Sequence, residues 1–370
     1  MGLIMKNKFL VILSLFHFSL HSVEVNNLVV PNGFKASLFA NNLDAPRQIA
    51  EGNKGYIFVG SKKGIVYALK DNDKNGQIDD VKIIFDGLND SSGVAYSNGS
   101  LFIAEIDKVW RVDNIEDNLD SFSDEPLKKT LVTDDLPSDQ WHGRKWIMID
   151  DDGSIVLNVG APCNVCLKED ERYATIIRLK ENRWIIEARG VRNSVGFDIN
   201  PINGKLYFTD NGRDWMGDSM PSCELNVVDK EGSFYGYPFK HAKNVIDPEF
   251  GSMIPTVKKE FIDPIAELGP HVAPLGIAFY DNDVFPKKYK NSIFVALHGS
   301  WNRTKKSGYT VVFVKLDDDG KYLYQEDFIT GWLSNESAWG RPVSPFIMKD
   351  GSMLLSDDKY NVIYRVTYKG

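Results

Sequence analysis

The sequence predicts an all-β protein, a six-bladed β-propeller, because one strand pattern recurs six times and no long helical periodicity interrupts it. In each unit a turn residue precedes a short run of β-forming residues, a break of small residues and a second β run. The units begin at residues 55, 99, 153, 204, 291 and 352, so their spacing lies between 44 and 87 residues. That spacing fits four-stranded blades with variable loops, whereas a β-sandwich does not predict six such units.

A second element lies directly upstream of each unit, where a polar residue is followed by a strand of small and apolar residues. The six segments read APRQIAE at 45, SSGVAYS at 91, HGRKWIMI at 142, RNSVGFDI at 192, APLGIAFY at 273 and GRPVSPFIM at 340. In a propeller these are the innermost strands, and the loops leading into them converge on the central axis at one face.

Polar side chains at these strand starts should therefore point toward one another. They are Arg47, His142, Arg144, Arg192, Asn193 and Arg341. Arginines that gather against their mutual repulsion in an acidic chain imply an anionic ligand with several carboxylates or phosphates, which guanidinium groups bind bidentately. The alternative is that each arginine caps a blade edge or pairs with a nearby acid.

Residues 1–22 read as a secretory signal peptide, in which Lys6 and Lys8 precede an apolar run too short to span a membrane. Residues 23–370 then form a single propeller domain that is soluble and periplasmic or secreted, with no membrane span. Loss of the leader removes two lysines and changes the formal net charge from −8 to −10. Such a charge does not suggest a nucleic-acid-binding protein.

The three cysteines, Cys163, Cys166 and Cys223, are too few for a disulfide scaffold, and the CNVC pair lacks the partners of a zinc site. One disulfide and one spare thiol are expected. His241 has no motif around it and is expected at the surface.

The segment DNDKNGQIDD, residues 71–80, follows the order of an EF-hand loop but has Lys82 at the twelfth position. Without a bidentate acid there, we expect a hairpin turn, with a weak surface calcium site as the alternative. Most tryptophans should lie in the core, whereas Trp215 and Trp301 are in glycine-rich loops where they could form walls for a planar ring or a sugar.

Several motifs occur in the order typical of one known family. They are WHGRKW, ARGVRNSVGFD, FTDNGRDWMGD, CELN, ELGPHVAPLG, ALHGSWNR and AWGRPV. From about Pro31 to Tyr368 the chain resembles the glucose/sorbosone dehydrogenase family, and it is most similar to the sorbosone-dehydrogenase-like branch. The resemblance implies an exported six-bladed propeller that uses pyrroloquinoline quinone (PQQ) with Ca²⁺. PQQ carries three carboxylates, so it matches the anion that the arginines predict.

The resemblance also implies roles for single residues. His142 would be the general base that takes the hydroxyl proton of the substrate while hydride passes to PQQ, and the neighbouring cations Arg144 and Lys145 would keep its imidazole neutral. Arg192 and Asn193 would hold the cofactor and polarise the quinone oxygen. The backbone carbonyls of Gly212 and Arg213 would bind calcium. The remaining cofactor contacts would come from Arg47, Arg144, Asn211, His271, His298, Arg303 and Arg341.

The function implied is oxidation of an aldose, a sorbosone-like aldehyde or a related sugar alcohol, with a quinone or cytochrome as electron acceptor. The chain departs from relatives at Trp141, where better-known members carry an aspartate, at Cys223, where many have aspartate, and at Ser92, where a histidine is common. Two alternatives therefore stay open: a metal-dependent lactonase-type propeller, and a propeller that binds a sugar or a partner without catalysis.

Overall fold

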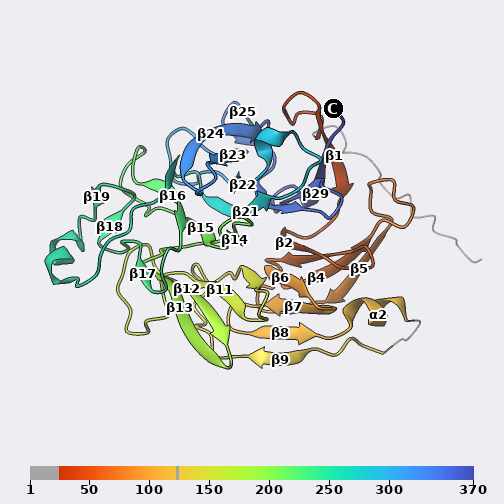
Figure 1. Ribbon diagram of the computed structural model, residues 1–370, viewed down its shortest axis with the longest axis horizontal. Helices are drawn as coiled ribbons and strands as arrows, with labels where there is room; N and C mark the ends of the chain where they lie inside the picture. The colour runs from red at the N-terminus through yellow and green to blue at the C-terminus, as the bar shows by residue number, and fades with distance from the viewer. Residues whose placement is uncertain (1–24, 122–124) are drawn as a thin grey trace, which may run out of the picture.

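The computed structural model describes residues 25–121 and 125–370, so the predicted signal peptide lies outside the described residues. Six sheets of four or five strands follow one another around a common centre, which confirms the predicted six-bladed propeller (Figure 1). Most strands that follow one another in a blade are antiparallel neighbours, as hairpin connections require.

The strands of the first three blades have the following bounds. Blade 1 contains β2 (Pro46–Glu51), β3 (Tyr56–Ser61), β4 (Val66–Lys70) and β5 (Asp80–Phe85). Blade 2 contains β6 (Gly93–Ser97), β7 (Ser100–Ala104), β8 (Val109–Val112) and β9 (Thr130–Thr133), with the short helix α2 (Ile115–Asp120) before its last strand. Blade 3 contains β10 (Ile147–Ile149), β11 (Ile155–Val159), β12 (Thr175–Lys180) and β13 (Arg183–Arg189), and β17 (Ser233–Phe234) joins its outer edge in parallel.

The last three blades complete the ring. Blade 4 contains β14 (Phe197–Ile199), β15 (Leu206–Asp210), β16 (Ser222–Val227) and β20 (Ala266–Pro270). Blade 5 contains β21 (Pro274–Tyr280), β22 (Ser292–Leu297), β23 (Thr310–Leu316) and β24 (Tyr322–Ile329). Blade 6 contains β27 (Pro342–Ile347), β28 (Met353–Asp357), β29 (Val362–Tyr368) and the N-terminal strand β1 (Phe34–Ala40).

Smaller elements lie in the loops within and between the blades. They are the hairpins β18 (Lys240–His241) with β19 (Val245–Ile246) and β25 (Leu333–Ser334) with β26 (Ser337–Ala338), and the 3-10 helices Gly251–Thr256 and Lys287–Tyr289. The described residues include no helix that is long and apolar enough to cross a membrane.

The N-terminal strand closes the ring, because β1 pairs with β29 from Phe34 opposite Tyr368 to Ala40 opposite Ile363. The Phe34 ring packs edge-on against Phe285 and Phe328 of blade 5. This pairing covers the edge of β29, which would otherwise expose unpaired backbone groups. It also ties the two ends of the chain into one sheet.

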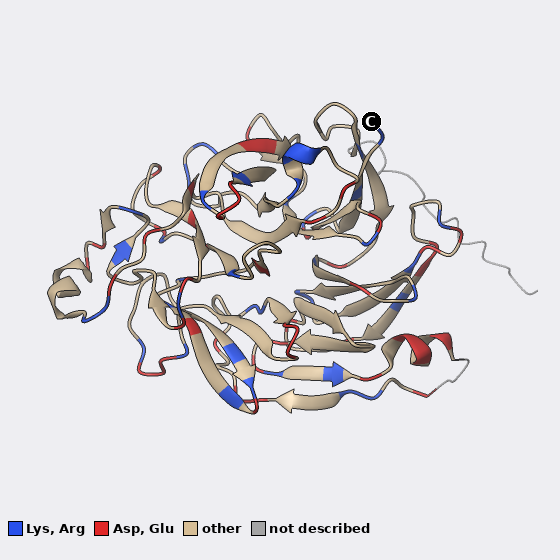
Figure 2. Cartoon of the chain, viewed as in Figure 1, with Lys and Arg blue, Asp and Glu red and all other residues tan. Residues whose placement is uncertain are grey.

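The predicted inner strands are confirmed as β2, β6, β10, β14, β21 and β27, each at one edge of its sheet. Apolar residues fill the spaces between neighbouring blades, as where Trp146 of the segment leading into β10 packs with Phe197 and Phe208 of blade 4. Acidic residues lie mainly in loops and at outer elements such as α2 (Figure 2). The predicted site residues lie near the starts of the inner strands or after the ends of β15 and β22, so the fold brings them to one face.

The cysteine prediction is confirmed, because Cys163 and Cys166 form a disulfide and Cys223 is a free, buried thiol. The surface position expected for His241 is wrong. His241 is 4% exposed, and its Nε2 lies 2.9 Å from Asp247 Oδ2. His241 lies in β18, and its partner Asp247 directly follows β19, a contact that sequence patterns around a single residue do not reveal.

Candidate functional site

Strained backbone marks the face where the inner strands begin. His142 has φ 56°, Ala45 has φ 46°, and His271 and Ala273 have φ 61° and 51°. The left-handed region costs a residue with a Cβ roughly 1–2 kcal/mol, so such residues persist only where the surroundings impose them. Such strain often gathers at functional sites.

The His142 ring is fixed from both of its nitrogens. Nδ1 lies 2.7 Å from the carbonyl oxygen of Ala161, and the indole Nε1 of Trp141 donates to Nε2 at 3.0 Å. A carbonyl only accepts, so Nδ1 carries the hydrogen and Nε2 presents its lone pair. The Ala161 carbonyl thus orients the ring in the place of a neighbouring carboxylate, and Trp141 covers the proton-accepting nitrogen.

Burial, followed by the charges of Arg192 and Arg144, lowers the pKa of His142 to about 3, although the Ala161 carbonyl raises it. The imidazole is therefore neutral at ordinary pH, as predicted, and Arg144 contributes as predicted. Lys145 does not contribute, because its Nζ turns away to donate to Gly143 O at 2.6 Å, and burial lowers its own pKa to about 8.

Gly160 packs against both His142 and Asn193, since a Cβ placed on it would lie 2.6 Å from His142 Cβ and 3.3 Å from Asn193 Oδ1. The backbone N–H groups of Arg192 and Asn193 donate to the carboxylate of Asp210 at 2.8 and 2.7 Å. Asn193 Oδ1 is buried and accepts no hydrogen bond from the described residues. An unpaired buried oxygen is costly, so it points to a donor that binds there.

Asn211 Nδ2 donates to the carbonyl oxygens of Asn193 and Pro274 at 3.0 and 2.9 Å. This amide joins the inner-strand loops of blades 4 and 5. The Arg192 guanidinium is 4% exposed, and its Nη2 lies 3.2 Å from Asp214 Oδ2. Arg192 is thus held from the side of the loop that follows β15.

A second group of charges surrounds Asp358. Arg47 Nη1 and Lys62 Nζ lie 2.9 and 3.0 Å from Asp358 Oδ2, and His298 Nε2 lies 2.8 Å from Oδ1. Burial lowers the pKa of His298 to about 4, against the carboxylate that raises it. Arg341 Nε donates to His298 O at 2.9 Å. A cavity of about 580 Å³ opens here and is lined in part by Lys62, His298, Arg341 and Asp358.

Arg144 connects the two groups, because its charge acts on both Arg47 and His142 while its Nε pairs with Asp90 Oδ2 at 2.8 Å. Arg341 forms no ion pair with any carboxylate of the described residues. Four other cations, Arg47, Lys62, Arg144 and Arg192, pair with three carboxylates, those of Asp90, Asp214 and Asp358. The excess of positive charge fits an anionic ligand.

Two predicted contacts lie at the rim. His271 Nε2 lies 2.7 Å from Gly217 O, and Arg303 Nε donates to Asp218 O at 3.0 Å. Both side chains hold the loop after β15. Trp215 and Trp301 meet edge-on in the same region, with ring centroids 5.5 Å apart, and both are mostly exposed.

The residues predicted to bind calcium lie in this loop. The Gly212 N–H donates to Cys223 Sγ at 3.4 Å, and the Arg213 side chain turns away to pair with Asp247 and Glu249. Among the described residues, no donor reaches the carbonyl oxygen of Gly212 or Arg213. Burial raises the pKa of Cys223 to about 11, so this thiol is neutral at ordinary pH.

Sequence reasoning missed Asp358, Asp90 and Asn164, which contact predicted site residues, and Lys62, which pairs with Asp358. Asp358 directly follows β28, and Asp90 lies just before β6. Their signal was position, since a polar residue at the end of a blade strand lies on the same face as the inner-strand starts. Asn164 lies inside the CNVC motif, whose pattern indicates a role only for its cysteines.

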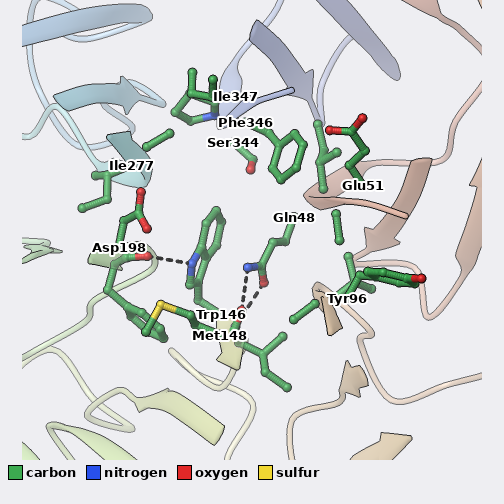
Figure 3. Close-up of a pocket in the computed structure, with 18 of the residues that line it drawn as sticks. Gln48, Glu51, Tyr96, Trp146, Met148, Asp198, Ile277, Ser344, Phe346 and Ile347 are labelled. Atoms are coloured by element: carbon green, nitrogen blue, oxygen red, sulfur yellow. Dashed lines mark hydrogen bonds between the residues drawn. The ribbon is translucent and has the colours of Figure 1, made fainter. Parts of the chain in front are cut away.

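A separate cavity of about 340 Å³ lies further along the inner strands (Figure 3). Its polar side chains are satisfied by the backbone: Gln48 exchanges two hydrogen bonds with Ile147, and Trp146 Nε1 donates to Phe197 O at 3.2 Å. Asp198 accepts from the N–H groups of Phe279 and Ile199. This cavity contains none of the predicted site residues.

The loop Asp71 to Asp79 forms the expected turn between β4 and β5, in which Asp71 accepts from the N–H groups of Asn75 and Gly76. Ligand oxygens of Asp71, Asp73 and Asp79 lie within 4.8 Å of one another. Within residues 25–121 and 125–370 no other group of three acids, histidines or cysteines is arranged in this way.

Comparison with known proteins places the chain among related propellers. The profile of the family described as TrAA12-like matches residues 252–369. An uncharacterized protein of Borreliella burgdorferi is 36% identical over 385 residues, which cover 99% of this chain and 100% of that protein. The calcium structure of the Trichoderma reesei carbohydrate-active enzyme of family AA12 has a TM-score of 0.77 and 20% identity, over 92% of this chain and 97% of that one. The holo form of the PQQ domain of pyranose dehydrogenase from Coprinopsis cinerea has a TM-score of 0.71 and 18% identity, over the same shares.

The chain shares its six-bladed propeller fold with these solved structures, in agreement with the resemblance that the motifs indicate. The chain belongs to the same family as the Borreliella burgdorferi protein.

Proposed function

We propose that this protein is an exported sugar oxidoreductase that uses PQQ and Ca²⁺ to oxidise an aldose, a sorbosone-like aldehyde or a related sugar alcohol. The observation that carries the proposal is His142, a neutral histidine whose Nε2 lone pair lies beside an excess of arginines. The structural neighbours from Trichoderma reesei and Coprinopsis cinerea support the cofactor and the metal.

The residues present fit PQQ. Arg341 pairs with no carboxylate of the described residues, and Arg47 and Lys62 share the single carboxylate of Asp358. These three cations can therefore bind carboxylates of the cofactor. Asn193 Oδ1 lacks a donor within the described chain, and the Gly212 and Arg213 carbonyls are free to bind a calcium ion. Bound PQQ would supply a two-electron acceptor for the hydride of the substrate.

The protein groups then divide the remaining work. Nε2 of His142 takes the proton of the substrate hydroxyl, while Nδ1 stays hydrogen-bonded to Ala161 and keeps the ring in place. Arg192 places a positive charge next to this base, which lowers the cost of negative charge that develops during oxidation. The exposed Trp215 and Trp301 rings offer apolar faces to a sugar at the rim.

The test is reconstitution of the purified protein with PQQ and Ca²⁺, followed by dye reduction over a panel of aldoses, aldehydes and sugar alcohols. We expect turnover that requires both additions. A folded protein that neither binds PQQ nor reduces the dye refutes the proposal. Hydrolysis of a lactone without PQQ would instead support the lactonase alternative.

A further inference from the structure

Asn164, between the two disulfide-bonded cysteines, makes four hydrogen bonds toward the site. Its carbonyl oxygen accepts from Arg192 Nε at 2.9 Å, and its Oδ1 accepts from Arg192 Nη2 at 2.9 Å. Oδ1 also accepts from the Asp214 N–H at 2.9 Å, and Nδ2 donates to Asp214 O at 3.1 Å. Asn164 therefore binds both the Arg192 guanidinium and the backbone of Asp214, the residue whose carboxylate pairs with Arg192.

The remaining contacts of Arg192 complete this arrangement. Nη2 also lies 3.2 Å from Asp214 Oδ2, and Nη1 donates to Asn211 O at 3.2 Å. A guanidinium is planar and donates in fixed directions, so acceptors on three of its nitrogens determine both its place and its plane. Of these acceptors, Asn164 alone supplies two.

The loop that carries Asn164 is held on both sides. The Cys163–Cys166 disulfide closes it, and the hydroxyl oxygen of the buried Tyr237 accepts from the Cys166 N–H at 2.9 Å. The same hydroxyl lies 3.4 Å from Cys163 Sγ. Closing a short loop covalently removes conformations in which Asn164 would leave Arg192.

We infer that Asn164 is the positioning residue for Arg192, and that the disulfide and Tyr237 hold Asn164 for this task. The inference rests on the proposed function for the role of Arg192 toward PQQ. Its coupling to His142 is independent of any cofactor. His142 faces two cations, Arg192 and Arg144, besides the Ala161 carbonyl and the Trp141 indole.

The experiment compares wild type with Asn164→Ala and with Asn72→Ala, an exposed asparagine in the loop between β4 and β5. The first readout is the affinity for PQQ in the presence of Ca²⁺, which should weaken about tenfold or more in Asn164→Ala and stay unchanged in Asn72→Ala. The second readout is the His142 pKa, followed by NMR in the protein without cofactor. This pKa should rise in Asn164→Ala alone, because the Arg192 charge moves away from the ring.

Wild-type protein treated with dithiothreitol provides a second measurement if Asn164→Ala does not fold. Reduction should raise the His142 pKa of wild type, by less than the substitution Asn164→Ala does. It should not change the His142 pKa of the double variant Cys163→Ser, Cys166→Ser, in which that pKa is already raised. An unchanged His142 pKa in folded Asn164→Ala, or in reduced wild type where that variant does not fold, overturns the inference. If wild type binds no PQQ, the proposed function fails, and the His142 readout still decides the inference.

Discussion

The substitution Trp141→Phe isolates one contact, the indole N–H that donates to His142 Nε2 at 3.0 Å. In the free protein this bond occupies the lone pair that the substrate hydroxyl must reach. Phenylalanine keeps an aromatic ring at a side chain that is 55% exposed, so the change removes the donor and little packing.

The expected size follows from the strength of such a bond. A hydrogen bond between neutral groups contributes a net of about 0.5–1.5 kcal/mol, which corresponds to about two- to tenfold in an equilibrium constant. Because substrate no longer displaces the indole, kcat/KM should rise by about two- to tenfold in Trp141→Phe through a lower KM, with kcat nearly unchanged. The acid limb of the pH profile should also move to higher pH, since a donor on Nε2 opposes its protonation.

The assay is steady-state dye reduction by the PQQ- and Ca²⁺-loaded protein with its best aldose. The matched control is Trp184→Phe, which removes an indole N–H that donates to Asp135 Oδ2 at 3.3 Å on the outer strand β13. The control should leave both constants unchanged. A fall in kcat for Trp141→Phe would refute the reasoning. It would mean that the indole N–H assists the reaction itself and is not merely displaced from His142 Nε2 when substrate binds.

Three further predictions concern the charged groups. His142→Ala should lower kcat by at least about a hundredfold and leave PQQ affinity near that of wild type, and unchanged turnover would remove His142 from the mechanism. Asp358→Asn leaves the buried Arg47 without its carboxylate, so urea unfolding should show a loss of about 3–5 kcal/mol; full stability would mean that the ion pair is dispensable. Burial lowers the pKa of His298 to about 4 from 6.5, so between these pH values the unfolded chain binds a proton that the folded protein does not bind. As the pH falls from 6.5 to 4, the Tm of wild type should therefore drop relative to that of His298→Gln. Parallel Tm curves for the two proteins would contradict this.

The inner strands were predictable because each repeats the same short pattern at the same level of the propeller. His142 therefore lies near Arg192 and Arg144, and Arg47 lies near Arg144. Their partners were not predictable in this way, since Asp358 lies 311 positions from Arg47 and belongs to the last blade. The pairing of β1 with β29 also has no local signal, because it depends on the closure of the whole ring.

Side-chain direction accounts for the remaining differences. A pattern places a residue on a face, but neighbours from other loops decide where its functional atoms point. Lys145 stands next to Arg144 in the sequence, yet its amine bonds to Gly143 O inside the protein. In the sequence Trp141 is only a departure from the pattern of better-known relatives. In the structure its indole donates a hydrogen bond to His142.

The most direct test of the account is titration of the purified protein with PQQ in the presence of Ca²⁺, followed by the absorbance of PQQ. We predict saturable binding of one PQQ per chain that is lost on addition of a calcium chelator and weakened by Arg341→Ala. Absence of any spectral change with folded protein at excess PQQ and Ca²⁺ would contradict the central claim that this propeller face is a PQQ site.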